Sequence, residues 1–330
     1  MVRRLGDAVL GQDIEARFLE GRPNPAALPA MADASLLGLT LPPRYGGLGR
    51  DYHALATACE ELARVDLAYQ IGLTVHLALT AMTVLQWGTE TQKAAWLPAL
   101  ARGERIATFG LTAFLVLRET PGVATTVLGG KLGARAGDTG SVVCDRARVP
   151  AANVLGEPGE GFPVALSALA AGLFTVGAGA LGVATECLAL TVSFLQDLDR
   201  RGLRAGREQW VQARVAAMVA GEARSRLLLR RAAELKNRGL PSQRATSLAK
   251  WVAAEAANDA AEAALEVHQA FVPGPHPTVE RHLRNVKGAV IYGGTAEVHQ
   301  TMQAAYALGD RTERPFRRPP PTAADLAGLD

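Results

Sequence analysis

The sequence predicts a mainly α-helical protein, and three observations lead to this fold class. Apolar residues recur at helical spacing over most of the chain, whereas β-rich segments are confined to residues 107–150. The longest periodic stretches, 165–198, 208–238 and 242–270, follow one another. Only short breaks such as Gly239-Leu240-Pro241 separate them. Long helices joined by short turns predict a helical bundle.

Residues 1–106 are predicted to form an N-terminal helical domain. Residues 54–63 place apolar side chains at helical spacing and consist of good helix formers. Thr89 and Gln92 stand three residues apart where another helix is expected to begin. This spacing is typical of a capping box.

Residues 107–150 are predicted to form a shortened middle β segment. Short β-rich runs at 114–117, 123–128 and 141–144 are separated by Gly and Pro. At about 5–6 residues per strand plus turns, the segment has room for roughly four strands. That number is too small for an independent barrel.

The remainder of the chain is predicted to contain the helical bundle, residues 151–310, and a tail, residues 311–330. The tail is rich in Arg and Pro, and we expect it to be disordered, with a docking segment as the alternative.

Composition excludes several classes of protein. The net charge of +3 and the lack of a basic stripe with aromatic residues argue against nucleic-acid binding. Three scattered cysteines indicate neither a disulfide framework nor a metal site. Residues 165–182 approach the length of a membrane span, but a buried core helix is the preferred interpretation. With no signal peptide recognised, we expect a cytoplasmic protein without membrane contact.

A GxGxxG pattern at residues 177–182 suggests a dinucleotide site at first sight. Such a site needs these glycines at a strand-to-helix turn within a βαβ unit. Here both flanks continue one helical pattern, so we expect the glycines to allow close helix packing.

Several segments together resemble the acyl-CoA dehydrogenase family. In chain order they are residues 38–49, 60–66, 88–93, 131–133, 138–139, 149–156 and 292–299, the last of which begins Tyr292-Gly293-Gly294-Thr295. The resemblance implies a helical N-terminal domain, a β middle domain and a C-terminal four-helix bundle. It also implies a homodimer or homotetramer, which we expect to assemble through residues 160–270.

The resemblance also implies a chemistry whose proton acceptor is missing here. Family members use a Glu to remove the proton next to a thioester carbonyl, while a flavin accepts a hydride. In many members this Glu follows the Tyr of the last segment, where this chain has Gly293. In others it lies on the first bundle helix, where this chain has Gly172 and Leu173. Neither position carries a carboxylate.

The flavin contacts implied by the family are reduced as well. Thr112 matches the start of the flavin-binding strand, but the chain then continues into a later strand. Thr295 is the clearest retained nucleotide contact, and Arg200 or Arg201 could replace an Arg of the family. A glycine-rich pyrophosphate loop of the family aligns with Glu266, Gln269, Ala270 and Val272. We therefore expect no bound cofactor, with FAD as the alternative.

The preferred hypothesis is a non-redox enzyme of biosynthesis that acts on an acyl thioester or a polyketide-like chain, free or tethered to a carrier protein. Isomerisation, elimination and cyclisation all stay open. The candidate catalytic residues are Tyr292, His76 and Glu297, and Thr112 and Thr295 are polar neighbours. No metal ligands are expected.

Two alternatives remain from the sequence. A non-catalytic subunit would pair with an active paralogue through the well-preserved bundle helices. A genuine FAD-dependent dehydrogenase of acyl-CoA or of an acyl carrier protein would need an unusual flavin site.

Overall fold

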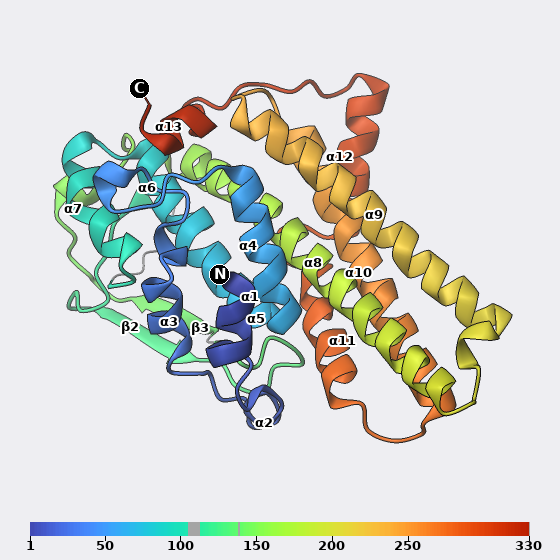
Figure 1. The fold of residues 1–330 in the computed structure, drawn as a ribbon. Coiled ribbons are helices and arrows are strands. Elements are labelled where there is room, and N and C mark those ends of the chain that lie inside the picture. Colours follow the sequence, from blue (N-terminus) through green and yellow to red (C-terminus); the bar gives the residue numbers. More distant parts are fainter. Residues whose placement is uncertain (105–112, 138, 330) are drawn as a thin grey trace.

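The computed structural model describes residues 1–104, 113–137 and 139–329, and it is mainly helical, as predicted (Figure 1). The N-terminal elements are α1 (Val2–Leu5), a π-helical turn (Gly6–Leu10), α2 (Ile14–Glu20), α3 (Ala27–Asp33), α4 (Tyr52–Val65), α5 (Leu67–Leu73), a second π-helical stretch (Thr74–Ala81), α6 (Met82–Trp87) and α7 (Glu90–Ala101). Short 3₁₀ turns lie at Leu36–Gly38 and Pro43–Tyr45. Helix α7 begins with the predicted capping box, in which Thr89 and Gln92 each bond the other's backbone N–H.

The second half of the chain contains the long helices of the bundle. These are α8 (Gly161–Arg200), α9 (Gln209–Asn237), α10 (Gln243–Phe271), α11 (Pro277–Ala289) and α12 (Ala296–Leu308). A 3₁₀ turn, Ala205–Arg207, connects α8 to α9. Helix α8 runs through the middle of the molecule and packs against α4, α9 and α10 (Figure 1). It joins the N-terminal helices to the bundle.

The GxGxxG pattern lies inside α8, and its glycines permit close packing. A Cβ at Gly177 would lie 3.1 Å from the Cα of Lys250 on α10. A Cβ at Gly179 would overlap the Gln70 side chain, and one at Gly182 would overlap the Glu60 carbonyl oxygen. Small residues are therefore required where α8 crosses its neighbours, as the sequence predicts.

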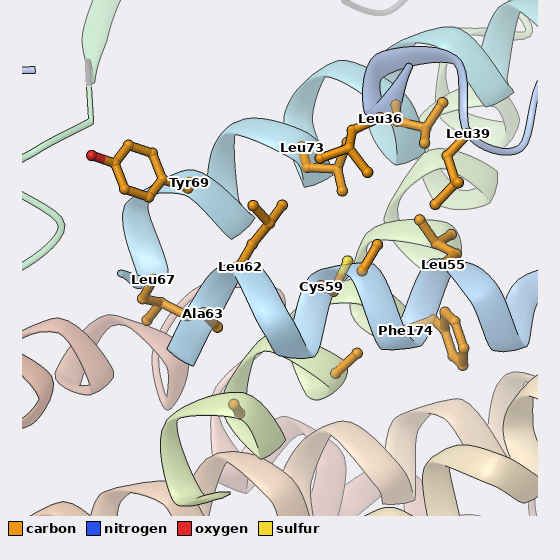
Figure 2. Packing of buried hydrophobic residues seen from close by; sticks show 14 of the residues in the cluster. Leu36, Leu39, Leu55, Cys59, Leu62, Ala63, Leu67, Tyr69, Leu73 and Phe174 are labelled. Carbon is orange, nitrogen blue, oxygen red and sulfur yellow. The ribbon is translucent and has the colours of Figure 1, made fainter. Parts of the chain in front are cut away.

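A large part of the hydrophobic core lies between α4, α5 and α8, and the core continues into the α8–α10 interface. Figure 2 shows part of it, including Leu55, Cys59 and Leu62 of α4 together with Phe174 of α8. The ring of Phe174 meets that of Tyr52 edge to face, with centroids 5.9 Å apart. Aromatic and leucine side chains thus fix the position of α8 against the N-terminal helices.

The middle segment forms two antiparallel strand pairs in the described residues. Strand β1 (Ala113–Phe114) pairs with β4 (Val154–Leu155), which a 3₁₀ turn, Ala151–Asn153, precedes. Strand β2 (Val123–Val127) pairs with β3 (Gly140–Cys144), and the side chains of β3 are exposed. This is the small β segment that the sequence predicts.

The C-terminal segment, which we expected to be disordered, is ordered in the structure. It returns from α12 across the molecule and ends in α13 (Ala323–Ala327), where Leu326 is fully buried (Figure 1). The guanidinium of Arg318 donates to the Trp87 carbonyl at 2.8 Å, and the Tyr52 hydroxyl donates to Pro321 at 3.1 Å. Contacts with distant residues give this Arg- and Pro-rich segment a fixed path.

Two apolar stretches, Leu67–Trp87 and Gly161–Arg200, are long enough to cross a membrane. In the most apolar 18-residue window of each stretch, 78% and 67% is buried inside the protein. Their hydrophobicity is therefore explained by the protein core.

Candidate functional site

A cavity of about 950 Å³ lies between α8, the end of α9, the start of α10, α12 and the C-terminal segment. Its α8 wall includes Leu166, Leu169 and Leu173, which share one face because they are spaced three and four residues apart. Leu166 and Leu169 remain 46% and 48% exposed in this position. Met302 of α12 adds to the lining. The cavity thus has a large apolar wall.

A buried histidine forms a polar part of the opposite wall. His299 on α12 is 2% exposed, and its Nδ1 lies 2.8 Å from the hydroxyl of Ser247 on α10. Its Nε2 is buried against the backbone of the Gly293-Gly294 loop and makes no well-aligned hydrogen bond among the described residues, although the loop backbone acts as an acceptor that favours the protonated ring. Burial lowers the pKa of His299, and the positive charge of Lys250 lowers it further. The neutral imidazole is therefore favoured.

Two lysines lie at the cavity or immediately behind its wall. Lys236 of α9 lines the cavity and is 4% exposed, with its Nζ 5.5 Å from the Tyr52 ring centroid and 5.7 Å from that of Phe174. Lys250 donates a hydrogen bond of 2.6 Å to the Gly294 carbonyl. Burial lowers the pKa of each lysine to about 8. The cavity therefore has a cationic side, and the charge of its two lysines depends on how deeply they are buried.

The C-terminal segment supplies further cations at the edge of the cavity. Arg311, Arg314 and Arg317 all contribute to the lining. Arg311 lies over the Tyr306 ring at 5.3 Å, and Arg317 pairs with Glu160 at 2.8 Å. These contacts hold the segment against α12 and the start of α8, so the arginines stay at the cavity.

Of the two positions where the family carries its Glu, Gly293 lies at the cavity and Gly172 does not. A Cβ at Gly293 would lie 3.3 Å from Cδ2 of Leu173. Gly172 instead faces the N-terminal helices, since a Cβ there would meet Leu79 at 2.7 Å. Gly293 and Leu173 both line the cavity. The place of the family's base is thus present, but it carries no proton acceptor.

The three predicted catalytic residues do not meet at this cavity. His76 lies within the N-terminal helices, where its Nε2 is 2.7 Å from the Leu100 carbonyl oxygen. Tyr292 packs its ring against Gly288, and its hydroxyl has no partner among the described residues. Burial raises the pKa of that hydroxyl. None of these side chains lines the cavity, and their catalytic roles stay predictions.

The third candidate, Glu297, lies in the exposed first turn of α12. A hydrogen bond from the Thr295 side chain lowers the pKa of its carboxyl. Thr295 itself stands at the N-cap position of α12, next to the Gly293-Gly294 loop. Glu297 is therefore placed to support the start of the helix and not to face the cavity lining.

The residues expected to hold a flavin are spread over the chain. Arg200 and Arg201 end α8 and pair with Asp197 at its exposed surface. Leu173, which lies beside the loop that carries Thr295, precedes them by 27 and 28 residues along α8. At 1.5 Å per residue, the two arginines are about 40 Å from this loop. A single chain cannot bring both ends to one flavin.

The residues aligned with the family's pyrophosphate loop also do not suit FAD. Glu266 forms an ion pair with Arg214 at 2.8 Å, and Gln269 donates to the Gly274 carbonyl at 2.8 Å. Both side chains are already engaged where the family has a backbone loop open to phosphate. Thr112 lies outside the described residues. The described residues of one chain therefore do not fit FAD.

Sequence reasoning did not find His299, Ser247, Lys236 or Lys250. They come from three helices, and no short motif connects them. The one available signal was the proximity of His299 to the Tyr292-Gly293-Gly294 segment, which the resemblance had already marked.

Comparison with known proteins agrees with the observed fold. Residues 1–104 match the family description "Acyl-CoA dehydrogenase, N-terminal domain", and residues 159–308 match "Acyl-CoA dehydrogenase, C-terminal domain". An acyl-CoA dehydrogenase of Bacillus subtilis (strain 168) is 28% identical over 335 aligned positions, covering 84% of this chain and 88% of the relative. The mitochondrial short-chain specific acyl-CoA dehydrogenase of Homo sapiens is 27% identical, covering 86% and 82%. The solved butyryl-CoA dehydrogenase of Megasphaera elsdenii superposes with a TM-score of 0.87 at 25% identity, covering 93% of this chain and 96% of the other. The chain belongs to the acyl-CoA dehydrogenase family.

Proposed function

We propose that this protein binds an acyl thioester in the cavity and removes a proton from the carbon next to the thioester carbonyl. The observation that carries the proposal is the position of the cavity. It lies between the leucine face of α8 and the Gly293-Gly294 loop, where the family places its proton acceptor. The named relatives act on acyl-CoA, which is an acyl thioester.

The two sides of the cavity suit the two parts of such a ligand. Leu166, Leu169 and Met302 offer apolar surface to an acyl or polyketide-like chain. Each methylene that this surface removes from water contributes about 0.8 kcal/mol. Arginines of the C-terminal segment, including Arg314, offer charge-assisted hydrogen bonds to phosphate groups of coenzyme A or of a carrier-protein arm.

Two versions of this function differ in the step after proton removal. The relatives are named as dehydrogenases, which favours oxidation with FAD as the electron acceptor. In the flavin-free version, the proton returns elsewhere or a bond next to the carbanion breaks, as in isomerisation, elimination or cyclisation. The engaged side chains of Glu266 and Gln269 at the aligned pyrophosphate positions support this second version, whereas the relatives support the first.

A single preparation separates the versions. The protein is purified without added flavin, its visible absorption is recorded, and FAD released by denaturation is counted per chain. Binding of butyryl-CoA and octanoyl-CoA is measured by calorimetry on the same sample. One FAD per chain supports the dehydrogenase, and thioester binding without FAD supports the flavin-free enzyme. Failure to bind either thioester overturns the proposal.

Assembly is a separate part of the proposal. Helix α9 exposes Trp210, Val219 and Leu227, which are apolar side chains within the predicted interface region, residues 160–270. Their exposure supports a homodimer or homotetramer, or pairing with a paralogue, and the cytoplasmic location expected from the sequence stays a prediction. Light scattering of the purified protein gives the mass directly, and a monomer at all concentrations would contradict self-association.

A further inference from the structure

The C-terminal segment closes the end of the cavity that lies opposite the Gly293-Gly294 loop. Leu173 of α8 lies beside this loop, and the residues that line the cavity follow α8 back from Leu173 to Pro163. At 1.5 Å per residue, these two residues are about 15 Å apart along the helix. Residues 309–317 run from the end of α12 to Glu160, directly before α8, and most of them line the cavity (Figure 1). The cavity therefore has one end at the loop and the other at this segment.

Phe316 of this segment lies at the boundary between two spaces. It lines the large cavity and also a smaller void of about 10 Å³, which has room for no more than about one water molecule. Residues of the N-terminal helices, including Tyr52 and Met82, line the void on its other side. Among the described residues, Ala170, Lys236 and Phe316 line both spaces. Of these three residues Phe316 alone has a bulky apolar side chain, so it is the one that can stop an acyl chain here.

Contacts of the next two residues hold Phe316 in place. Arg317 pairs with Glu160 at 2.8 Å, which attaches the segment to the start of α8. Arg318 donates to the Trp87 carbonyl at 2.8 Å and lies over the Trp87 ring, which attaches the segment to the end of α6. A ligand that pushed Phe316 aside would have to break the ion pair and the hydrogen bond. Phe316 is therefore part of a fixed wall.

From this arrangement we propose that Phe316 limits the length of the acyl chain that the cavity accepts. The inference rests on the proposed function, which places the thioester at the Gly293-Gly294 loop. With the thioester there, the acyl chain lies along the leucine face of α8 and its far end meets Phe316. The coenzyme lies along α12, towards Arg311, which contacts the Tyr306 ring. Methylenes that fit before Phe316 leave water and tighten binding, whereas a longer chain collides with the ring.

The test measures how affinity depends on the length of the acyl chain. The full-length protein, as purified, is titrated in a calorimeter with butyryl-, octanoyl-, dodecanoyl- and hexadecanoyl-CoA, each below its micelle concentration. For the wild-type protein, affinity should rise with chain length up to a limit and then fall. In Phe316→Ala the limit should move to longer chains, and each methylene newly accommodated should tighten binding roughly fourfold. Butyryl-CoA, whose chain is too short to reach Phe316, should bind both proteins equally.

Two further variants separate this role from a general loosening of the segment. Phe316→Trp places a larger ring at the same position and should move the limit to shorter chains. A loosened segment would not give opposite shifts for alanine and tryptophan. Phe162→Ala makes the matched change at the start of α8, where the side chain is 65% exposed and is not among the described residues that line either space. This variant should keep the wild-type dependence on chain length.

The outcomes separate the role of Phe316 from the proposed function. If the wild-type protein binds the thioesters and Phe316→Ala has the same limit, the role of Phe316 is wrong while the proposed function stands. Equal weakening at every chain length would also overturn the role, because the ring would then only support the wall. If the wild-type protein binds no thioester, the proposed function fails and the inference falls with it. Should Phe316→Ala not fold, the shift in Phe316→Trp decides.

Discussion

Two buried cations, Arg281 and Lys236, lie in very different surroundings. Each side chain belongs to a residue that is only 3% to 4% exposed. Arg281 on α11 donates to Asp66 at 3.0 Å, to Glu15 at 3.1 Å and to the Val65 carbonyl at 2.7 Å. Lys236 lies between two aromatic rings, and the one hydrogen bond it makes among the described residues, to the Ala170 carbonyl, is long at 3.5 Å.

The difference teaches which part of the molecule maintains the fold and which part is available for chemistry. Arg281 joins α11 to the N-terminal helices, and its charge is neutralised within the protein. Lys236 has no carboxylate within ion-pairing distance in the described part of the chain, and it faces the cavity. A charge that remains uncompensated at a cavity wall is expected to serve a ligand, at the expense of stability.

The largest effect is expected from breaking the compensated site. Arg281→Met removes the cation and leaves the fully buried carboxylate of Asp66 without its partner. Removal of one member of a buried ion pair destabilises by about 3–5 kcal/mol. The free energy of unfolding from urea titration should fall by this amount. Arg3→Met breaks an exposed pair with Glu61 and should cause no measurable change.

Replacing the uncompensated cation should have the opposite sign. The folded-state pKa of Lys236 is about 8, below the ordinary lysine value of 10.5, because burial penalises the charged form. Below pH 8 the folded protein therefore carries the full penalty. Between pH 8 and 10.5 the unfolded chain binds more protons, so stability from this residue rises with pH. Lys236→Met should add up to about 3 kcal/mol at pH 7.

The measurement compares wild-type and Lys236→Met unfolding at several pH values. The advantage of the variant should shrink as pH rises from 8 to 10.5. Butyryl-CoA binding should weaken in the same variant if the lysine serves the ligand. A loss of stability at pH 7 would place Lys236 in the same class as Arg281 and remove the contrast.

Two helical glycines allow the tightly packed interior to be compared with the open surface. Gly182 and Gly72 both lie in helices, but a Cβ at Gly182 would overlap the Glu60 carbonyl oxygen, whereas nothing lies within 4 Å of a Cβ at Gly72. Gly182→Ala should lower the free energy of unfolding by about 1–3 kcal/mol through overpacking. Gly72→Ala should raise it by up to about 1 kcal/mol, since alanine favours the helix. Equal shifts in thermal unfolding would show that α8 can move away from α4.

The features that the sequence could predict are those set by residues close together in the chain. The long helices, the capping box at Thr89 and the packing role of the α8 glycines follow from local spacing, and each is present in the structure. These features depend on neighbouring residues in the chain or on the small size of one residue. The family resemblance identified the Gly293 loop for a similar reason, because its matching residues are contiguous.

The cavity could not be predicted in this way. His299 meets Ser247 across 52 positions of sequence, and Lys236 meets Tyr52 across 184. Such pairs depend on how α9, α10 and α12 cross, which residue patterns do not encode locally. The order of residues 311–329 was also missed, because Arg- and Pro-rich composition gave no sign of contacts with Trp87 or Tyr52.

The smallest expected effect concerns Arg318, a cation whose surroundings are intermediate between those of Arg281 and Lys236. Its guanidinium lies 5.1 Å from the Trp87 ring centroid and donates to the Trp87 carbonyl, with no carboxylate among its described contacts. Arg318→Ala should destabilise by about 1 kcal/mol, the sum of a partly exposed cation–π contact and one hydrogen bond. Hydrogen exchange over residues 311–322 should accelerate more than exchange in α8, because the lost contacts hold only this segment. Arg146→Ala, at a side chain that is 91% exposed, should change neither quantity. If Arg318→Ala accelerated hydrogen exchange in α8 as well, the C-terminal segment would be part of the packed core and not only of the cavity wall.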